Sequence, residues 1–147
     1  IMRRVAPDGP VYQAGTLSGN PVAVAAGIRT LELLDDAAYE QLESAGARLQ
    51  AGLEEIISRN DYPAHVRRIG SMFTVFFRGE TVHDHADATA CDMERFRTFF
   101  GEMLQRGVYM APSPYEAGFL STKHTDDVID EHLEAADASL EVAFDRG

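Results

Sequence analysis

Several features are scarce in this sequence of 147 residues. The only cysteine is Cys91, so no disulfide can form within the chain. Such sparing use of cysteine is typical of a reducing cytoplasm, where we expect the protein to work. No run of 18 apolar residues occurs, so the sequence predicts no membrane-spanning helix. Residues 1–4 (IMRR) are followed by VAPD rather than by a long apolar segment, so we expect no secretory signal peptide.

Basic residues are also few. Lysine and arginine together number 13 against 24 aspartates and glutamates, which gives a formal net charge of −11 at pH 7. An acidic surface repels phosphate backbones, so we expect no nucleic-acid partner, and the charge favours solubility. Lysine occurs once, at Lys123. It is not part of a Gly-Lys-Ser or Gly-Lys-Thr sequence, which excludes a nucleotide P-loop.

The rest of the composition is that of an ordinary globular domain. Hydrophobic residues make up 45% of the chain and charged residues 25%. A chain of this length can bury a core without disulfides or metal. The sequence does not begin with Met, and its first helix signal comes only after residue 18. We therefore expect the N-terminus to be a cut inside a longer protein.

Two helices are predicted in the first half. Asn20 is a good N-cap and Pro21 suits the first helical turn. The helix that they open runs to Leu34 and is apolar on nearly all sides, so we expect it to be well buried. Residues 37–59 carry apolar side chains three and four positions apart, which predicts an amphipathic helix.

The second half mixes strands and helices. Residues 65–69 and the aromatic, β-branched segment 72–77 (MFTVFF) are predicted strands, separated by Gly70-Ser71. Residues 79–91 are turn-like, and a short strand is expected at 108–110. Residues 112–125 are expected to form a loop.

Two further helices are predicted beyond these strands. The first covers 92–106, with Phe96, Phe99 and Phe100 forming a core stripe. The second begins after Thr125 as N-cap and runs to about Phe144.

This order of elements predicts an α/β domain of the α+β kind. It is a small, mainly antiparallel sheet of about three strands with helices packed on it, preceded by a long helix. We expect a division near residue 34, with 1–34 and 35–147 as separate parts.

The segment from Gly15 to Pro21 (GTLSGNP) combines glycines and hydroxyl side chains just ahead of the first helix. Helix N-termini attract anions, because they carry unpaired N–H donors and partial positive charge. The segment is therefore either a phosphate site that includes Thr16 or an ordinary helix cap after a turn. The residues alone favour the cap.

Two longer blocks resemble a known family. Residues 9–27 (GPVYQAGTLSGNPVAVAAG) and residues 107–125 (GVYMAPSPYEAGFLSTKHT) closely resemble glutamate-1-semialdehyde 2,1-aminomutases, which belong to the class III pyridoxal-phosphate aminotransferases. Residues 68–73 and 96–104 also fit the family's pattern. The wider class III family shares the helix and the Gly-Thr pair before it, but usually not the whole second block. The resemblance extends over essentially the whole chain.

The resemblance implies a fold type I enzyme, a homodimer whose sites use pyridoxal 5'-phosphate at the subunit interface. It implies that residues 1–34 belong to the large-domain side and that 35–147 form the C-terminal small domain. It further implies that Gly15 and Thr16 reach the cofactor phosphate of the neighbouring subunit. The family's reaction converts glutamate-1-semialdehyde into 5-aminolevulinate on the way to tetrapyrroles (porphyrins).

The resemblance also implies a catalytic role for Glu116, which would lie near the substrate's amino groups. A carboxylate there could hold an ammonium group or assist proton movement. Tyr12 and Tyr115 are candidate walls of the pocket, although packing explains each equally well.

The family's Schiff-base lysine is missing from this sequence. It lies well upstream of the Gly-Thr pair, whereas Lys123 lies in the second block, so we interpret Lys123 as a surface residue. We therefore expect this chain to be a C-terminal fragment that is inactive alone. In such a fragment the apolar helix at 22–34 would be exposed and would mediate association, so we expect the fragment to form a dimer or higher oligomer.

Two other interpretations remain open: a fragment of another class III transaminase, and a non-catalytic module with this fold. A metal site is not predicted, although metal-ligating residue types gather in one loop. That loop is more simply solvated surface. It contains His83, Asp84, His85, Asp87, Cys91 and Asp92.

Overall fold

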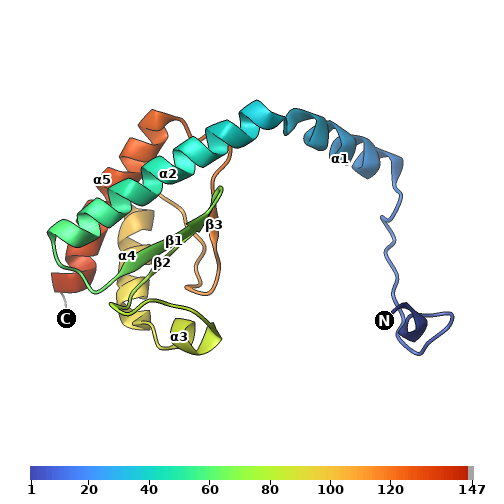
Figure 1. Cartoon of the computed structure of the whole chain (residues 1–147), viewed down its shortest axis with the longest axis horizontal. Coiled ribbons are helices and arrows are strands. Elements are labelled where there is room, and N and C mark those ends of the chain that lie inside the picture. The colour runs from blue at the N-terminus through green and yellow to red at the C-terminus, as the bar shows by residue number, and fades with distance from the viewer. Residues whose placement is uncertain (146–147) are drawn as a thin grey trace. The chain divides into compact units, whose positions relative to one another are not determined.

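The computed structural model describes residues 1–145 and divides the chain into two compact units, Ile1–Asp35 and Asp36–Gly147 (Figure 1). Among the described residues, no helix has the length and apolar character needed to cross a membrane. The assignment of residues 1–34 to a large-domain side stays a prediction.

The first unit contains a short 3-10 helix, η1 (Met2–Arg4), and one α-helix, α1 (Pro21–Leu33). The predicted start of α1 is confirmed. The Asn20 side chain accepts hydrogen bonds from the N–H groups of Val22 and Ala23 at 3.0 and 3.1 Å. This cap satisfies the first donors of the helix.

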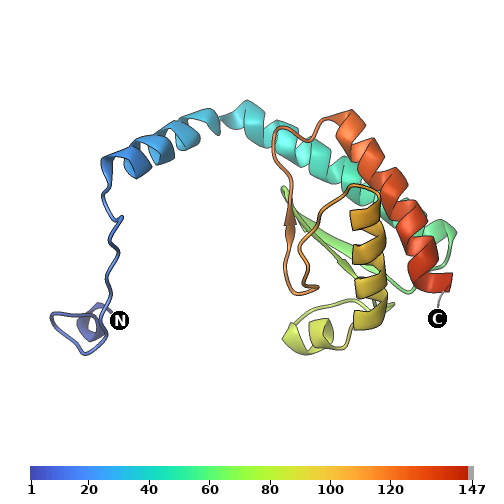
Figure 2. The same cartoon turned by 180° about the vertical axis from the view of Figure 1, so that it is seen from behind.

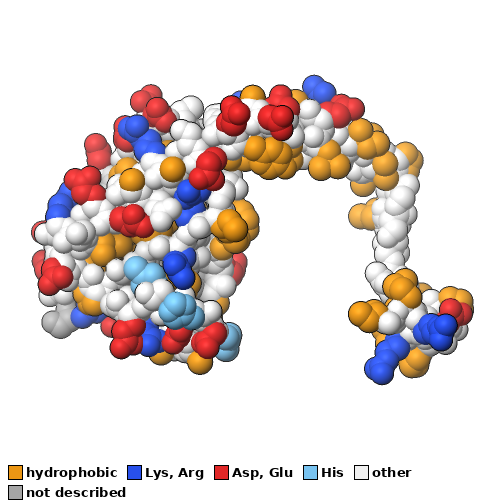
Figure 3. Space-filling model, in the orientation of Figure 1, with side chains coloured by type: hydrophobic (Ala, Val, Ile, Leu, Met, Phe, Trp, Pro, Cys, Tyr) orange, Lys and Arg blue, Asp and Glu red, His pale blue; other side chains and the backbone are white. Residues whose placement is uncertain are grey.

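The predicted burial of this helix is wrong for the chain as it stands. No residue of α1 is buried, and Val22 and Leu31 expose 77% and 71% of their surface. Orange apolar side chains are visible along α1 in the space-filling view (Figure 3). The physical reason lies in the unit itself, because 35 residues with a single long helix offer no second layer to pack on it.

The described residues of the second unit, 36–145, form four α-helices and a sheet. The helices are α2 (Asp36–Arg59), α3 (His85–Thr89), α4 (Met93–Gln105) and α5 (Asp126–Asp145). The strands are β1 (His65–Ile69), β2 (Met72–Phe76) and β3 (Gly118–Phe119). The sheet has the order β1-β2-β3 and both pairings are antiparallel. This confirms the predicted fold class.

One face of the sheet forms the core of this unit. The register pairs Val66 with Val75 and Arg68 with Phe73, and directly opposite residues of antiparallel strands share a face. The buried strand residues pack in one apolar cluster with α2, α4 and α5, and Figures 1 and 2 show α4 and α5 side by side. The aromatic stripe of α4 is confirmed as core, since the Phe99 ring lies 5.4 Å from that of Phe77.

The third strand is not where the sequence placed it. Residues 108–110 have no strand pairing, and β3 instead lies inside the predicted loop 112–125. Val108 donates its N–H to the carbonyl of Met103, so this segment closes the end of α4 and does not join the sheet. Helix α3 also forms in the predicted turn region, capped by the Asp84 side chain.

Truncation of a core side chain on α4 should destabilise the second unit. Met103 is fully buried, whereas its neighbour Leu104 is 48% exposed. We expect Met103→Ala to lower the free energy of unfolding by about 2–5 kcal/mol, because it removes buried apolar contacts and leaves a cavity. Urea denaturation of the 147-residue chain measures this. Leu104→Ala is the matched control, and an equal loss in both variants would contradict this core.

Candidate active-site elements

The segment predicted to hold a phosphate forms two consecutive turns ahead of α1. The N–H of Ser18 donates to the Gly15 carbonyl, and the N–H of Asn20 donates to the Leu17 carbonyl, both at 3.0 Å. A Cβ atom on Gly15 would lie 2.4 Å from the Ser18 hydroxyl oxygen, which is closer than such atoms approach. A larger residue at position 15 would therefore displace the Ser18 hydroxyl from its place beside the turn.

The hydrogen-bond donors free to bind an anion in this segment are not the first N–H groups of α1. Pro21 has no N–H, and Asn20 occupies the N–H groups of Val22 and Ala23. Thr16 is exposed, and no hydrogen bond described in residues 1–145 uses its N–H or its hydroxyl. An anion would therefore meet the turn at Thr16 rather than the first turn of α1.

Glu116 lies in the second unit, on the loop between α4 and β3. A tight turn precedes it, in which the N–H of Glu116 donates to the Ser113 carbonyl at 3.2 Å. Strand β3 begins two residues later and fixes the other side of the loop. There, a Cβ on Gly118 would lie 2.7 Å from the Phe73 ring, so a larger residue would have to displace that ring.

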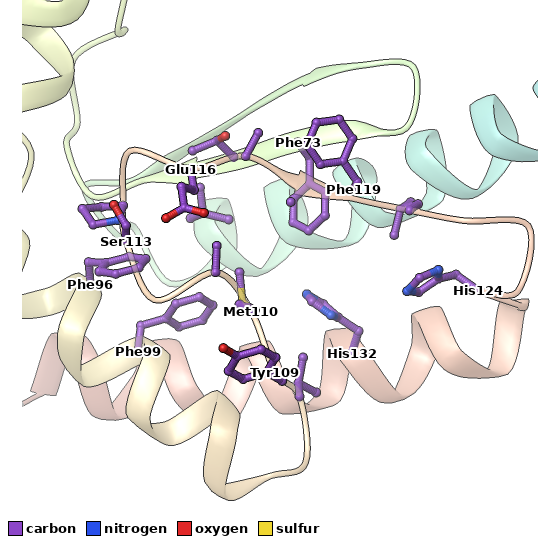
Figure 4. A pocket seen from close by; sticks show the side chains of 18 of the residues that line it. Phe73, Phe96, Phe99, Tyr109, Met110, Ser113, Glu116, Phe119, His124 and His132 are labelled. Carbon is purple, nitrogen blue, oxygen red and sulfur yellow. The ribbon is translucent and has the colours of Figure 1, made fainter. Parts of the chain in front are cut away.

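Glu116 borders a cavity of about 470 Å³ within the second unit (Figure 4). The cavity lies between β2, α4, α5 and the loop, and its walls combine aromatic and smaller apolar side chains with a few polar ones. In the close-up, Glu116 and Ser113 lie toward one end, while His124 and His132 lie toward the other. The principal aromatic residues of the lining are Phe73, Phe96, Phe99, Tyr109 and Phe119.

Neither tyrosine suggested by the sequence as a pocket wall lines this cavity. Tyr115 is 56% exposed and directs its hydroxyl to the Met93 sulfur at 3.6 Å, outside the cavity lining. Tyr12 is 82% exposed in the first unit. Tyr109 lines the cavity instead. No local pattern marks Tyr109 in the sequence, because its position depends on how the chain turns after α4.

His132 is a second cavity residue that was not predicted from the sequence. Its ring meets the edge of Phe73 with centroids 6.1 Å apart. Burial lowers the pKa of His132 from 6.5 to about 4, and nearby His124 acts in the same direction. His132 is therefore neutral at pH 7. Its helical spacing from Ile129 and Ala136, both buried, would have been a usable signal.

The remaining polar candidates make local contacts. The His124 ring accepts the N–H of Ser121 at 2.9 Å, a contact within the turn before α5. Lys123 is exposed and does not line the cavity. In the loop rich in metal-ligating residue types, Asp87 binds the N–H of His83 and the Arg78 guanidinium. Among the described residues, no three His, Cys, Asp or Glu side chains are placed to share a metal ion.

Solved structures with a similar fold include a transaminase and an aminomutase. An ω-transaminase from Sphaerobacter thermophilus superimposes with a TM-score of 0.77 at 25% identity, covering 99% of this chain and 34% of that one. A glutamate-1-semialdehyde aminomutase from Pseudomonas aeruginosa PAO1 gives 0.80 at 22% identity, covering 93% and 31%. The chain thus has the fold of one part of such an enzyme.

The sequence comparison agrees with the fold. The class-III aminotransferase family matches residues 1–139, and the chain belongs to this family. Curated relatives include the glutamate-1-semialdehyde 2,1-aminomutase of Anaeromyxobacter dehalogenans, 52% identical over 136 residues, and that of Thermus thermophilus, 51% identical over 142 residues. These alignments cover 92% and 95% of this chain. They confirm the resemblance noted in the sequence.

The chain spans about a third of the length of the curated relatives that it matches, 32% and 33% for these two. Most of the length of such an enzyme therefore has no counterpart in these 147 residues.

Stability should fall in mild acid because of His132. Its pKa of about 4 lies below the unfolded value of 6.5, so the unfolded chain takes up a proton between these pH values and the folded chain does not. We expect the free energy of unfolding to fall by up to about 3 kcal/mol from pH 6.5 to pH 4 through this group. Denaturation as a function of pH measures the slope. His132→Leu should flatten it, and an unchanged slope in that variant would rule out the assignment.

Proposed function

We propose that this chain is part of a pyridoxal-phosphate-dependent aminomutase, an isomerase that converts glutamate-1-semialdehyde into 5-aminolevulinate for porphyrin biosynthesis. The observation that carries the proposal is the 52% identity over 136 residues to a curated enzyme of that name. The ω-transaminase structure, at 25% identity, is a more distant match. Of these two activities, the aminomutase is therefore better supported.

The turn at residues 15–16 is suited to hold the cofactor phosphate. Pyridoxal phosphate, when bound, supplies the electron sink for the chemistry. Gly15 leaves the space beside the turn free of a Cβ, and Thr16 presents an N–H and a hydroxyl that make no other described hydrogen bond. Such donors match a phosphate dianion. We propose that Gly15 and Thr16 serve the cofactor of the second subunit in a homodimer.

Glu116 is the proposed catalytic group of this chain. An ionised carboxylate has only acceptor oxygens, so it can hold the substrate's ammonium group. It can also accept a proton and return it while the amino group moves between neighbouring carbons. The short turn at Ser113 and the pairing of β3 hold the backbone on both sides of Glu116, at the cavity's border.

The cofactor-binding lysine must come from another part of the enzyme. The only lysine of the chain, Lys123, is exposed and lies apart from the cavity lining. A large domain with that lysine, joined to this chain, would complete the catalyst. Association through the exposed apolar side chains of α1 would bring two copies together.

Activity should require the rest of the enzyme. We expect a chimaera, in which this chain replaces the matching third of the Thermus thermophilus aminomutase, to produce 5-aminolevulinate from glutamate-1-semialdehyde. The purified 147-residue chain should produce none, because it lacks the lysine. A colorimetric assay of 5-aminolevulinate measures both. Turnover by the chain alone, or transamination of other amino donors in preference by the chimaera, would overturn the proposal.

Loss of the Thr16 hydroxyl should weaken cofactor binding. In the chimaera, Thr16→Val should raise the dissociation constant of pyridoxal phosphate by about 10- to 100-fold, because it removes a hydrogen bond to a charged group. Equilibrium dialysis measures this constant. Thr30→Val is the control, since the described hydrogen bond of the Thr30 hydroxyl is to the Ala26 carbonyl within α1. Equal losses in both variants would show that Thr16 does not meet the phosphate.

A further inference from the structure

Arg68 links helix α2 to the turn of the β1–β2 hairpin. Its side chain is only 13% exposed, on the buried face of β1. Its Nη1 and Nη2 atoms bind the two carboxylate oxygens of Glu43 at 3.0 and 2.7 Å, and its Nε donates to Gln50 at 2.9 Å. The Nη1 also donates to the Gly70 carbonyl in the hairpin turn at 2.7 Å. Hydrogen bonding to Arg68 lowers the pKa of Glu43, so the pair is charged at neutral pH.

The backbone is built to allow this link. A Cβ on Gly46 would lie 2.5 Å from the Gly70 carbonyl oxygen and 3.1 Å from the Arg68 Nη1. Helix α2 and the hairpin turn therefore touch at a position where only glycine fits. Gly70 itself has φ +56°, a conformation that favours glycine.

The same turn holds the strand that follows Glu116. The Ser71 carbonyl, next to Gly70, accepts the N–H of Leu120 at 2.9 Å. Beyond it, Met72 and Phe73 of β2 pair with Phe119 and Gly118 of β3. Glu116 lies two residues before β3, so the position of its loop depends on where the hairpin turn is held.

We propose that Arg68 is a positioning residue for Glu116, acting through the hairpin turn and β3. The proposal rests on the catalytic role proposed above for Glu116. The chain of contacts runs from Glu43 and Gln50 on α2, through Arg68 to the Gly70 carbonyl, and from Ser71 to Leu120. Arg68 does not line the cavity, and its described hydrogen bonds do not reach Glu116, so its effect on the reaction must pass through these contacts.

Arg48, on helix α2, provides a comparison for Arg68, which binds the same helix from β1. The Arg48 Nη2 binds both carboxylate oxygens of Asp130 on α5 at 2.6 and 2.7 Å. It thus joins two elements through the same kind of ion pair. Its side chain is 45% exposed, and its described bonds do not involve the hairpin. If any ion pair between elements supported the loop of Glu116, Arg48→Met and Arg68→Met would change Leu120 exchange and kcat alike. If Arg68 positions that loop, only Arg68→Met should change them.

Amide hydrogen exchange in the 147-residue chain tests the structural part. We expect Arg68→Met to speed exchange of the Leu120 N–H by at least about tenfold, because the carbonyl partner at Ser71 is no longer held. Exchange at Leu140 in the core should stay unchanged, and Arg48→Met should leave Leu120 unchanged. Should Arg68→Met fail to fold, Glu43→Gln provides a second variant. It weakens the same ion pair from its exposed side, and we expect it also to speed exchange of the Leu120 N–H. Unchanged exchange at Leu120 in a folded variant of either kind would overturn the proposal.

A double-mutant cycle in the chimaeric aminomutase tests the functional part. We expect Arg68→Met to lower kcat by about 10-fold or more through misplacement of a catalytic group, with KM little changed. In a Glu116→Gln background, the same substitution should have no further effect, because the group that it positions is gone. Arg48→Met should retain the parent kcat.

The outcomes of the cycle are distinct. Equal losses from Arg68→Met with and without Glu116 would show a merely structural role and overturn the proposal. Absence of 5-aminolevulinate from the parent chimaera would instead contradict the proposed function. In that case, the exchange of Leu120 still decides whether Arg68 holds the loop.

Discussion

Packing of α2, α4 and α5 on one face of a small sheet is the constraint on which the second unit depends. Leu53, Met103 and Leu140 are fully buried at this contact. Removal of their apolar surface from water provides the main stabilisation, and it holds three strands too short to be stable alone. The polar links between elements, including that of Arg68, act on helices and strands that this core has already brought together.

The elements with strong local signals were predicted closely from the sequence. Apolar spacing predicted a helix over 37–59, and α2 covers Asp36–Arg59. The segment MFTVFF predicted β2, and Asn20 predicted the start of α1. Strand β3 could not be predicted in this way. It has two residues, one of them Gly118, and hydrogen bonds to β2, far away in sequence, define it.

The candidate site was predicted only in part, and for a similar reason. Glu116 and the turn at Gly15 followed from resemblance to a family, because both lie in long contiguous blocks of sequence. His132 and the network around Arg68 join residues far apart in the chain, and no spacing rule connects Glu43 to Gly70. The burial expected for α1 failed because it was inferred from composition alone. Burial also requires a partner surface, which the first unit does not contain.

The attachment of β3 has a consequence for how such a chain can diversify. Two residue pairs and the bond from Leu120 to Ser71 fasten this strand among the described residues, and the loop before it carries few core side chains. Substitutions between residues 111 and 117 therefore alter the border of the cavity at little cost to folding. On this side the border of the cavity is formed by loop residues outside the core cluster, so the loop can vary while the scaffold stays the same.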